Sequence, residues 1–150
     1  MKARYHARMK RLVFILLLPL CSFNTNYESI SITLEISNLE NNSSPVRIGI
    51  YRANDDFPDE KGYYKAYVCN PATSGSTRYT ITGLEEGDYA FALYQDINGN
   101  GKLGTNMFGY PKEPFAFSNN VKPVIKAPTF SECKVKLTRS SNQISVRMIR

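Results

Sequence analysis

The sequence of 150 residues contains one histidine and no tryptophan. The histidine, His6, lies in an N-terminal segment that we expect to be removed, so the mature chain would have none. Histidine is a ligand in many zinc sites and the general base of Ser-His-Asp and Cys-His enzymes. The sequence also has no P-loop and no glycine-rich dinucleotide motif. These absences exclude His-dependent hydrolase sites and the common nucleotide sites, although a pair of carboxylates could still catalyse hydrolysis.

Long apolar runs are also scarce. The longest, residues 12–20, follows five of the 19 Lys and Arg residues of the chain. A basic stretch before a short apolar run is typical of a secretory signal, and the run is too short for a stable membrane span. We therefore expect a signal peptide at residues 1–22 and one exported domain at residues 23–150, which is periplasmic, extracellular or attached to the envelope of a bacterium. An uncleaved helix that anchors the chain in the membrane is the alternative.

The mature chain has almost no net positive charge, because the basic surplus of the sequence lies in the leader. Nucleic-acid-binding domains concentrate Lys and Arg on one surface. The sequence therefore predicts no nucleic-acid partner, and membrane contact only through the signal or a lipid anchor.

Cysteine occurs at three positions. Cys21 follows the apolar run, where a lipoprotein carries its lipid, but Leu20 is larger than the residue usually found before a lipidated cysteine. The sequence is therefore compatible with two alternatives, lipidation of Cys21 and ordinary cleavage after Ser22. Cys69 and Cys133 lie in predicted strands. In an exported chain they can form a disulfide, or they can remain buried thiols that pack as small apolar residues.

The mature chain has no sustained helical periodicity and instead shows short segments in which apolar and polar residues alternate. This alternation is typical of strands with one buried face. About seven such segments predict an all-β fold, a single antiparallel β-sandwich, in which the first two strands form a hairpin. Residues 89–94 are apolar on both faces, which predicts a central strand. The expected strands are residues 30–36, 46–50, 63–69, 77–82, 89–94, 130–137 and 144–149.

The loop after the central strand matches the first half of a calcium-binding loop, D-x-[DN]-x-[DN]-G. Oxygen atoms at alternate positions of such a loop can converge on one cation, and Gly101 permits the sharp turn. The second half fails, since Met107 stands where a bidentate Glu is needed. We expect either a weak structural Ca²⁺ site in the Asp96–Asn106 loop or a turn whose side chains cap their own backbone. The candidate ligands are Asp96, Asn98, Asn100, the backbone carbonyl of Lys102 and, from outside the loop, Glu113.

The segment that follows is rich in proline and aromatic residues, with FGYP at 108–111 and PFAF at 114–117. Many exposed aromatic side chains would be costly in water. This segment is therefore predicted to cap one end of the sandwich or to line a shallow cleft.

The run from Leu84 to Asn120 resembles the signature of the bacterial domain-of-unknown-function 2141 family, and a looser similarity extends from about Ile32 to the C-terminus. The resemblance implies a secreted or envelope protein with a prealbumin-like or immunoglobulin-like β-sandwich and no established activity. Members of the family usually have an acidic residue at the position of Gly104, a His at that of Gln95 and an acidic residue at that of Ile97. These departures remove potential ligands, so the resemblance implies a weaker cation site here than in a typical member.

Two functions fit these observations. The first is a non-enzymatic binding or structural accessory module that recognises an unknown protein or glycan at the cell envelope and uses no cofactor beyond a structural Ca²⁺. The second is a hydrolase in which Asp96 and Glu113 act as the catalytic carboxylates. A concave pocket with clustered acids would favour the hydrolase, and Asn side chains satisfied by the backbone would favour the module.

Overall fold

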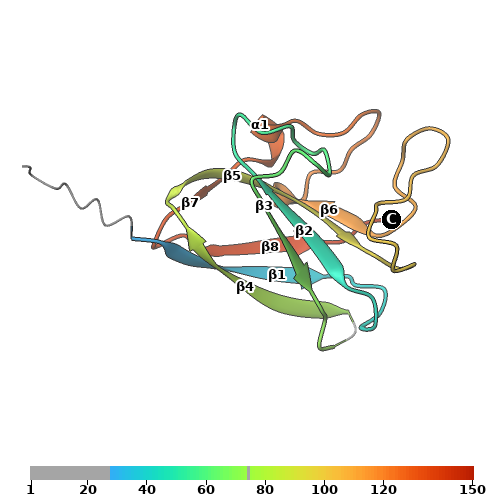
Figure 1. Cartoon of the computed structure of the whole chain (residues 1–150), viewed down its shortest axis with the longest axis horizontal. Helices are drawn as coiled ribbons and strands as arrows, with labels where there is room; N and C mark the ends of the chain where they lie inside the picture. The colour runs from blue at the N-terminus through green and yellow to red at the C-terminus, as the bar shows by residue number, and fades with distance from the viewer. Residues whose placement is uncertain (1–27, 74) are drawn as a thin grey trace, which may run out of the picture.

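A computed structural model describes residues 28–73 and 75–150. The expected signal peptide and Cys21 lie outside these residues. The described chain forms two sheets packed face to face, which is an all-β sandwich as predicted (Figure 1). Within the described residues, no helix has the length and apolar character needed to cross a membrane. The elements are β1 (Ile30–Ser37), β2 (Val46–Tyr51), β3 (Lys65–Cys69), β4 (Ser76–Leu84), β5 (Gly87–Gln95), β6 (Phe115–Phe117), the 3-10 turn η1 (Ser118–Asn120), α1 (Phe130–Cys133), β7 (Val135–Leu137) and β8 (Gln143–Arg147).

One sheet has three strands in the order β4-β1-β8, and the other has the order β3-β2-β5-β6, with β7 pairing the start of β5. The predicted hairpin of the first two strands is wrong, because β1 and β2 belong to different sheets. The polar turn at residues 38–45 carries the chain from one sheet to the other. The sandwich is also not purely antiparallel, since β1 pairs antiparallel with β4 but parallel with β8.

Two segments differ locally from the predicted strands. Residues 115–117, within the aromatic segment, form β6 against β5. Residues 130–133 form a helical turn instead of the start of a strand, because Glu132 accepts hydrogen bonds from both the backbone N–H and the hydroxyl of Thr129. Such a capping box favours the start of a helix. The strand therefore begins only at Val135.

The space between the sheets is filled by aliphatic side chains at alternate positions of the strands. Leu34 and Ile36 of β1 and Ile48 and Ile50 of β2 share one core and are fully buried. Phe91, on the central strand β5, is the largest fully buried side chain of this core. Burying one such side chain stabilises the fold by about 1.5–3 kcal/mol.

A second apolar cluster covers part of the other side of the five-stranded sheet. Phe115 and Phe117 of β6 are buried there under Phe130 of α1 and Phe57 of the β2–β3 loop. The ring of Phe57 meets those of Phe117 and Phe130 edge-on, with centroids 5.8 and 6.4 Å apart. Part of the aromatic segment thus covers the outer face of this sheet, whereas the prediction had it capping one end of the sandwich. In Figure 1, α1 accordingly lies on the opposite side of the five-stranded sheet from β1, β4 and β8.

Cys69 and Cys133 are free, buried thiols. Cys69 belongs to the core between the sheets, whereas Cys133 belongs to the outer aromatic cluster. The five-stranded sheet lies between the two clusters, so the alternative of a disulfide is not realised and the alternative of two buried thiols is. Burial raises the pKa of both thiols, that of Cys133 to about 12.

Candidate functional site: a groove beside the Asp96 loop

The outer face of the five-stranded sheet forms a groove of about 660 Å³ next to the aromatic cluster. A row of small residues on three neighbouring strands, Ala66, Gly49 and Ala92, lies at one register level of the floor. The Tyr51 ring folds over Gly49, where an added Cβ would lie 2.9 Å from the ring. A larger residue here would displace the Tyr51 ring, whose hydroxyl donates to the carbonyl of Asp59 at 2.8 Å. The sheet is hollowed here because its own side chains are small.

The walls of the groove come from three loops, at residues 58–63, 101–111 and 123–127. A concave volume of this size with several aromatic side chains in its lining is typical of small-molecule sites. The aromatic residues that line the groove include Tyr67, Tyr94, Phe108, Tyr110, Phe115 and Phe117. The second predicted alternative, a cleft, therefore holds for part of the aromatic segment.

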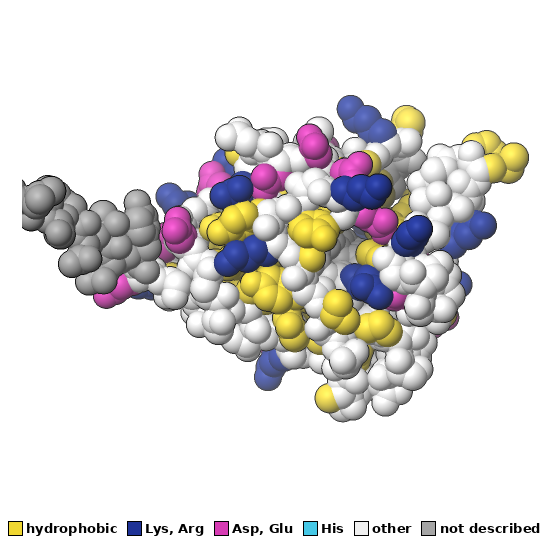
Figure 2. Space-filling model, viewed as in Figure 1, with side chains coloured by type: hydrophobic (Ala, Val, Ile, Leu, Met, Phe, Trp, Pro, Cys, Tyr) yellow, Lys and Arg dark blue, Asp and Glu magenta, His cyan; other side chains and the backbone are white. Residues whose placement is uncertain are grey.

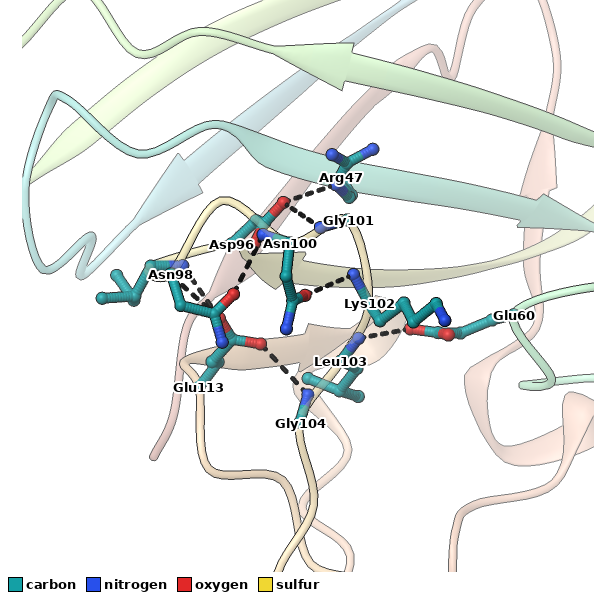
Figure 3. A network of polar contacts seen from close by, with 11 residues as sticks. Arg47, Glu60, Asp96, Asn98, Asn100, Gly101, Lys102, Leu103, Gly104 and Glu113 are labelled. Carbon is teal, nitrogen blue, oxygen red and sulfur yellow. Dashed lines mark hydrogen bonds and ion pairs between the residues drawn. The ribbon is translucent and has the colours of Figure 1, made fainter.

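Arg47 of β2 places a positive charge in this groove. Its Nε donates a hydrogen bond to Asp96 Oδ2 at 2.8 Å, and its side chain is 34% exposed while that of Asp96 is fully buried. The guanidinium lies against Gly101, where an added Cβ would stand 3.2 Å from Nη2. In Figure 3 its two η nitrogens extend away from Asp96. Arg47 is thus held through one nitrogen and presents the other two beside the groove.

Asp96 directly follows β5 and is 1% exposed. Burial alone would raise its pKa, but Arg47 and the backbone N–H of Gly101, which donates to Oδ2 at 3.0 Å, together lower the pKa of this carboxyl below its usual range. The other oxygen, Oδ1, is buried and has no hydrogen-bond partner among the described residues. A buried acceptor without a donor is costly. Among the loop oxygens, Oδ1 is therefore the one that a bound cation would stabilise most.

The two Asn residues of the loop cap their own backbone. Asn98 Oδ1 accepts from the N–H of Asn100 at 3.0 Å, and Asn100 Oδ1 accepts from the N–H of Lys102 at 2.8 Å (Figure 3). These bonds belong to the self-capped turn expected as the alternative to an ion site. No group of three or more His, Cys, Asp or Glu side chains that could hold a metal ion occurs in residues 28–73 and 75–150.

Glu113 lies on the opposite side of the loop from Arg47 (Figure 3). It is buried, and its Oε1 accepts from the N–H groups of Ile97 and Asn98 at 2.9 and 3.4 Å, while Oε2 accepts from that of Gly104 at 3.2 Å. The structure thus brings Glu113 to the predicted loop, but as an acceptor for three backbone donors. It fastens the two ends of the loop together.

Arg47 escaped the sequence-based reasoning. Arg47 precedes Asp96 by 49 positions, so no motif joins them. The available signal was its place as the one charged residue in the otherwise apolar strand β2. Glu60, one of the acids of the β2–β3 loop, accepts from the N–H of Leu103 at 2.6 Å and ties that loop to the Asp96 loop.

A family model described as an uncharacterized protein conserved in bacteria (DUF2141) matches residues 34–145. The chain belongs to this family. The DUF2141 match begins within β1 and ends within β8, so it includes most of both sheets, the groove and the Asp96 loop. It confirms the resemblance carried by the run from Leu84 to Asn120. No curated protein and no solved structure matches the chain.

Proposed function

We propose that this DUF2141 protein is an exported, non-enzymatic binding module of the bacterial envelope, and that its groove takes up an acidic, partly apolar group of an envelope protein or glycan. The observation that carries this proposal is the Arg47 guanidinium, fixed at Nε by the buried Asp96 carboxylate and free at its η nitrogens beside an aromatic-lined groove. A guanidinium held in this way offers two parallel N–H donors, which match a carboxylate. The aromatic walls suit an apolar body next to that acid.

The geometry supports carboxylate-dependent hydrolysis less well. A general acid needs a raised pKa near neutrality, as buried carboxyls in apolar pockets have. The pKa of Asp96 is lowered instead, despite its burial, because Arg47 and Gly101 stabilise the ionised form. Glu113 already accepts three backbone hydrogen bonds. Both carboxylates thus serve to hold the loop and Arg47.

Two fluorescent probes with the same aromatic body test the groove. Anilinonaphthalene sulfonate is anionic and N-phenyl-1-naphthylamine is uncharged, and each would be titrated with residues 23–150, which contain both sheets and both apolar clusters. We expect the anionic probe to bind more tightly. Arg47→Met should weaken it by roughly tenfold, the loss of one charge-assisted hydrogen bond or more. The uncharged probe should be weakened much less, and its change measures what the loss of the Asp96 partner does to the groove wall.

Arg147→Met is the matched control, because Arg147 lies on the outer face of the other sheet. It removes the same charge and should change neither titration. Binding of neither probe would refute the groove as a ligand site. Equal loss of the anionic probe in both Arg variants would reduce the effect to net charge and refute the role of Arg47.

We also propose, as a second property favoured by the unpartnered Oδ1 of Asp96, that the loop binds a single Ca²⁺ weakly and that this ion is structural. The carbonyl of Lys102 and the side chains of Asn98 and Asn100 would contribute uncharged ligands, and the Arg47 charge would keep the affinity low. Calcium should raise the midpoint of thermal unfolding relative to chelator in the parent, by mass action. Asp96→Ala should abolish this difference. The same midpoint with calcium and chelator in the parent would show that the loop is only a self-capped turn.

A further inference from the structure

Two loop tips beside the groove expose large apolar side chains almost completely. The first tip consists of Met107 and Phe108, which are 90% and 87% exposed, and the second of Val124 and Ile125, which are 90% and 97% exposed. Both tips belong to the walls of the same groove. They therefore protrude from one region of the molecule, and Figure 2 shows hydrophobic side chains at the end of the projecting loop at the upper right.

The first tip is a firmly built turn. Thr105 and Pro111 form a bridge at its neck, and Asn106 Oδ1 accepts from the N–H groups of Phe108 and Tyr110 at 2.9 and 3.0 Å. A backbone hydrogen bond from Asn106 N–H to Tyr110 O, at 2.8 Å, closes the turn. The turn is thus held by its backbone and by Asn106. The outward apolar side chains at its apex contribute little to the fold, so another interaction has to account for them.

The segment that carries both tips has an excess of positive charge, although Glu60 of the neighbouring loop accepts from the N–H of Leu103. Between Gly101 and Ala127 the sequence has four Lys residues, all exposed, and a single acid, the buried Glu113. Acidic residues slightly outnumber basic ones in the rest of the described chain, so the excess of positive charge belongs to the segment that carries the two tips. Lysines that flank exposed apolar side chains are typical of segments that enter the interface of an anionic membrane. The four lysines are Lys102, Lys112, Lys122 and Lys126.

We infer that the two tips dock onto an anionic lipid surface, with the four apolar side chains entering the interfacial layer and the lysines lying at the headgroups. Specific protein interfaces need a continuous patch of about 800 Å² on each partner. Two separate projections with a groove between them do not supply one, whereas a fluid lipid layer closes around each projection. This contact would be additional to any signal or lipid anchor, and it would turn the mouth of the groove toward the membrane.

Sedimentation of residues 23–150 with vesicles tests this inference. Vesicles of phosphatidylcholine mixed with phosphatidylglycerol should bind the protein roughly tenfold more tightly than vesicles of phosphatidylcholine alone, because several lysines act together. The double variant Phe108→Ser, Ile125→Ser should lose binding to the mixed vesicles and keep the parent's thermal midpoint. Val68→Ser changes an exposed apolar side chain of β3 and should bind as the parent does.

The charge requirement is tested separately. The double variant Lys122→Glu, Lys126→Glu should remove the preference for anionic vesicles, while Lys136→Glu on β7 should leave that preference nearly intact. Parent protein that stays in the supernatant with both vesicle types would overturn the inference. Retained binding of the serine double variant to the mixed vesicles would also overturn it. A concentration-dependent dimer of the parent that the serine double variant abolishes would overturn it as well, because the tips would then bind a second copy of the chain.

Discussion

The two outer faces of this sandwich are built on the same alternation of side chains, yet they are chemically opposite. On the three-stranded sheet, Glu35 of β1 accepts from Arg78 of β4 at 2.8 Å and from Ser145 of β8 at 3.2 Å, across all three strands. On the five-stranded sheet the outward positions carry Gly49, Ala92 and the buried aromatic residues of β6. One face is a polar surface, and the other is the base of a further layer of loops.

Each face also contains one pair between an Arg and a carboxylate at 2.8 Å. Arg78 is 77% exposed, so solvent screens its pair with Glu35 and the pair contributes little to stability. The carboxylate of the Arg47–Asp96 pair is fully buried, so loss of Arg47 would leave an uncompensated charge. The same two chemical groups therefore contribute little to stability on one face, whereas on the other they hold a buried loop in place.

The largest expected effect comes from the layer that only the five-stranded sheet carries. Phe115→Ala removes a buried ring that packs against Phe117 and Tyr110. We expect the free energy of unfolding, measured by urea titration, to fall by about 3–5 kcal/mol, as for other buried Phe→Ala changes. Thr80→Ala on the outer face of the three-stranded sheet should change it by less than about 0.5 kcal/mol. Similar values for the two variants would mean that the outer layer is not a second core.

The next effect concerns the carboxylate that fastens the Asp96 loop. Glu113→Ala leaves three backbone N–H groups of the loop without their acceptor. The free energy of unfolding should fall by about 2–3 kcal/mol, since hydrogen bonds to a charged group are the stronger ones. Glu35→Ala is the comparison on the polar face and should have a much smaller effect. If Glu113→Ala unfolded at the parent's urea midpoint, the loop would not depend on this fastening.

The sequence predicted the sandwich well because alternation reports on the immediate neighbours of each residue. It placed the central strand at residues 89–94, within the observed β5. It did not predict the sheet partners, because pairing of β1 with β8 depends on contacts more than a hundred residues apart. The same limit applies to the site. The spacing of Asp96, Asn98 and Asn100 was readable as a cation loop, whereas the contribution of Arg47 could be known only once β2 lay beside β5.

A smaller effect depends on pH and sharpens the contrast between the two pairs. Arg47 and Gly101 lower the folded-state pKa of Asp96 below its unfolded value near 3.9. The ionised carboxylate therefore stabilises the folded state fully above that unfolded value. This stabilisation is lost as the pH falls through the folded-state pKa. Asp96→Asn should therefore be less stable than the parent at neutral pH by about 1–3 kcal/mol. The difference should shrink below about pH 4. Urea titrations across this range measure it, with Glu85→Gln, an exposed carboxylate, as the control. A difference that stays constant with pH would show that the charge of Asp96 is not what stabilises the loop.

The smallest expected effect is kinetic and compares the two apolar clusters directly. Cys69 lies between the sheets and Cys133 lies in the outer layer, and burial raises the pKa of both thiols, so neither forms much thiolate at neutral pH. Native residues 23–150 should react with a thiol reagent far more slowly than the unfolded chain does. Of the two, Cys133 should react first, because a layer of loops and one helical turn opens locally more readily than paired strands do. Mass spectrometry of the labelled peptides at increasing times gives the order. Labelling of Cys69 before Cys133 would show that the core between the sheets, and not the outer layer, opens more readily. Equal rates would mean that both thiols are exposed only by global unfolding. The two apolar clusters would then form one cooperative unit.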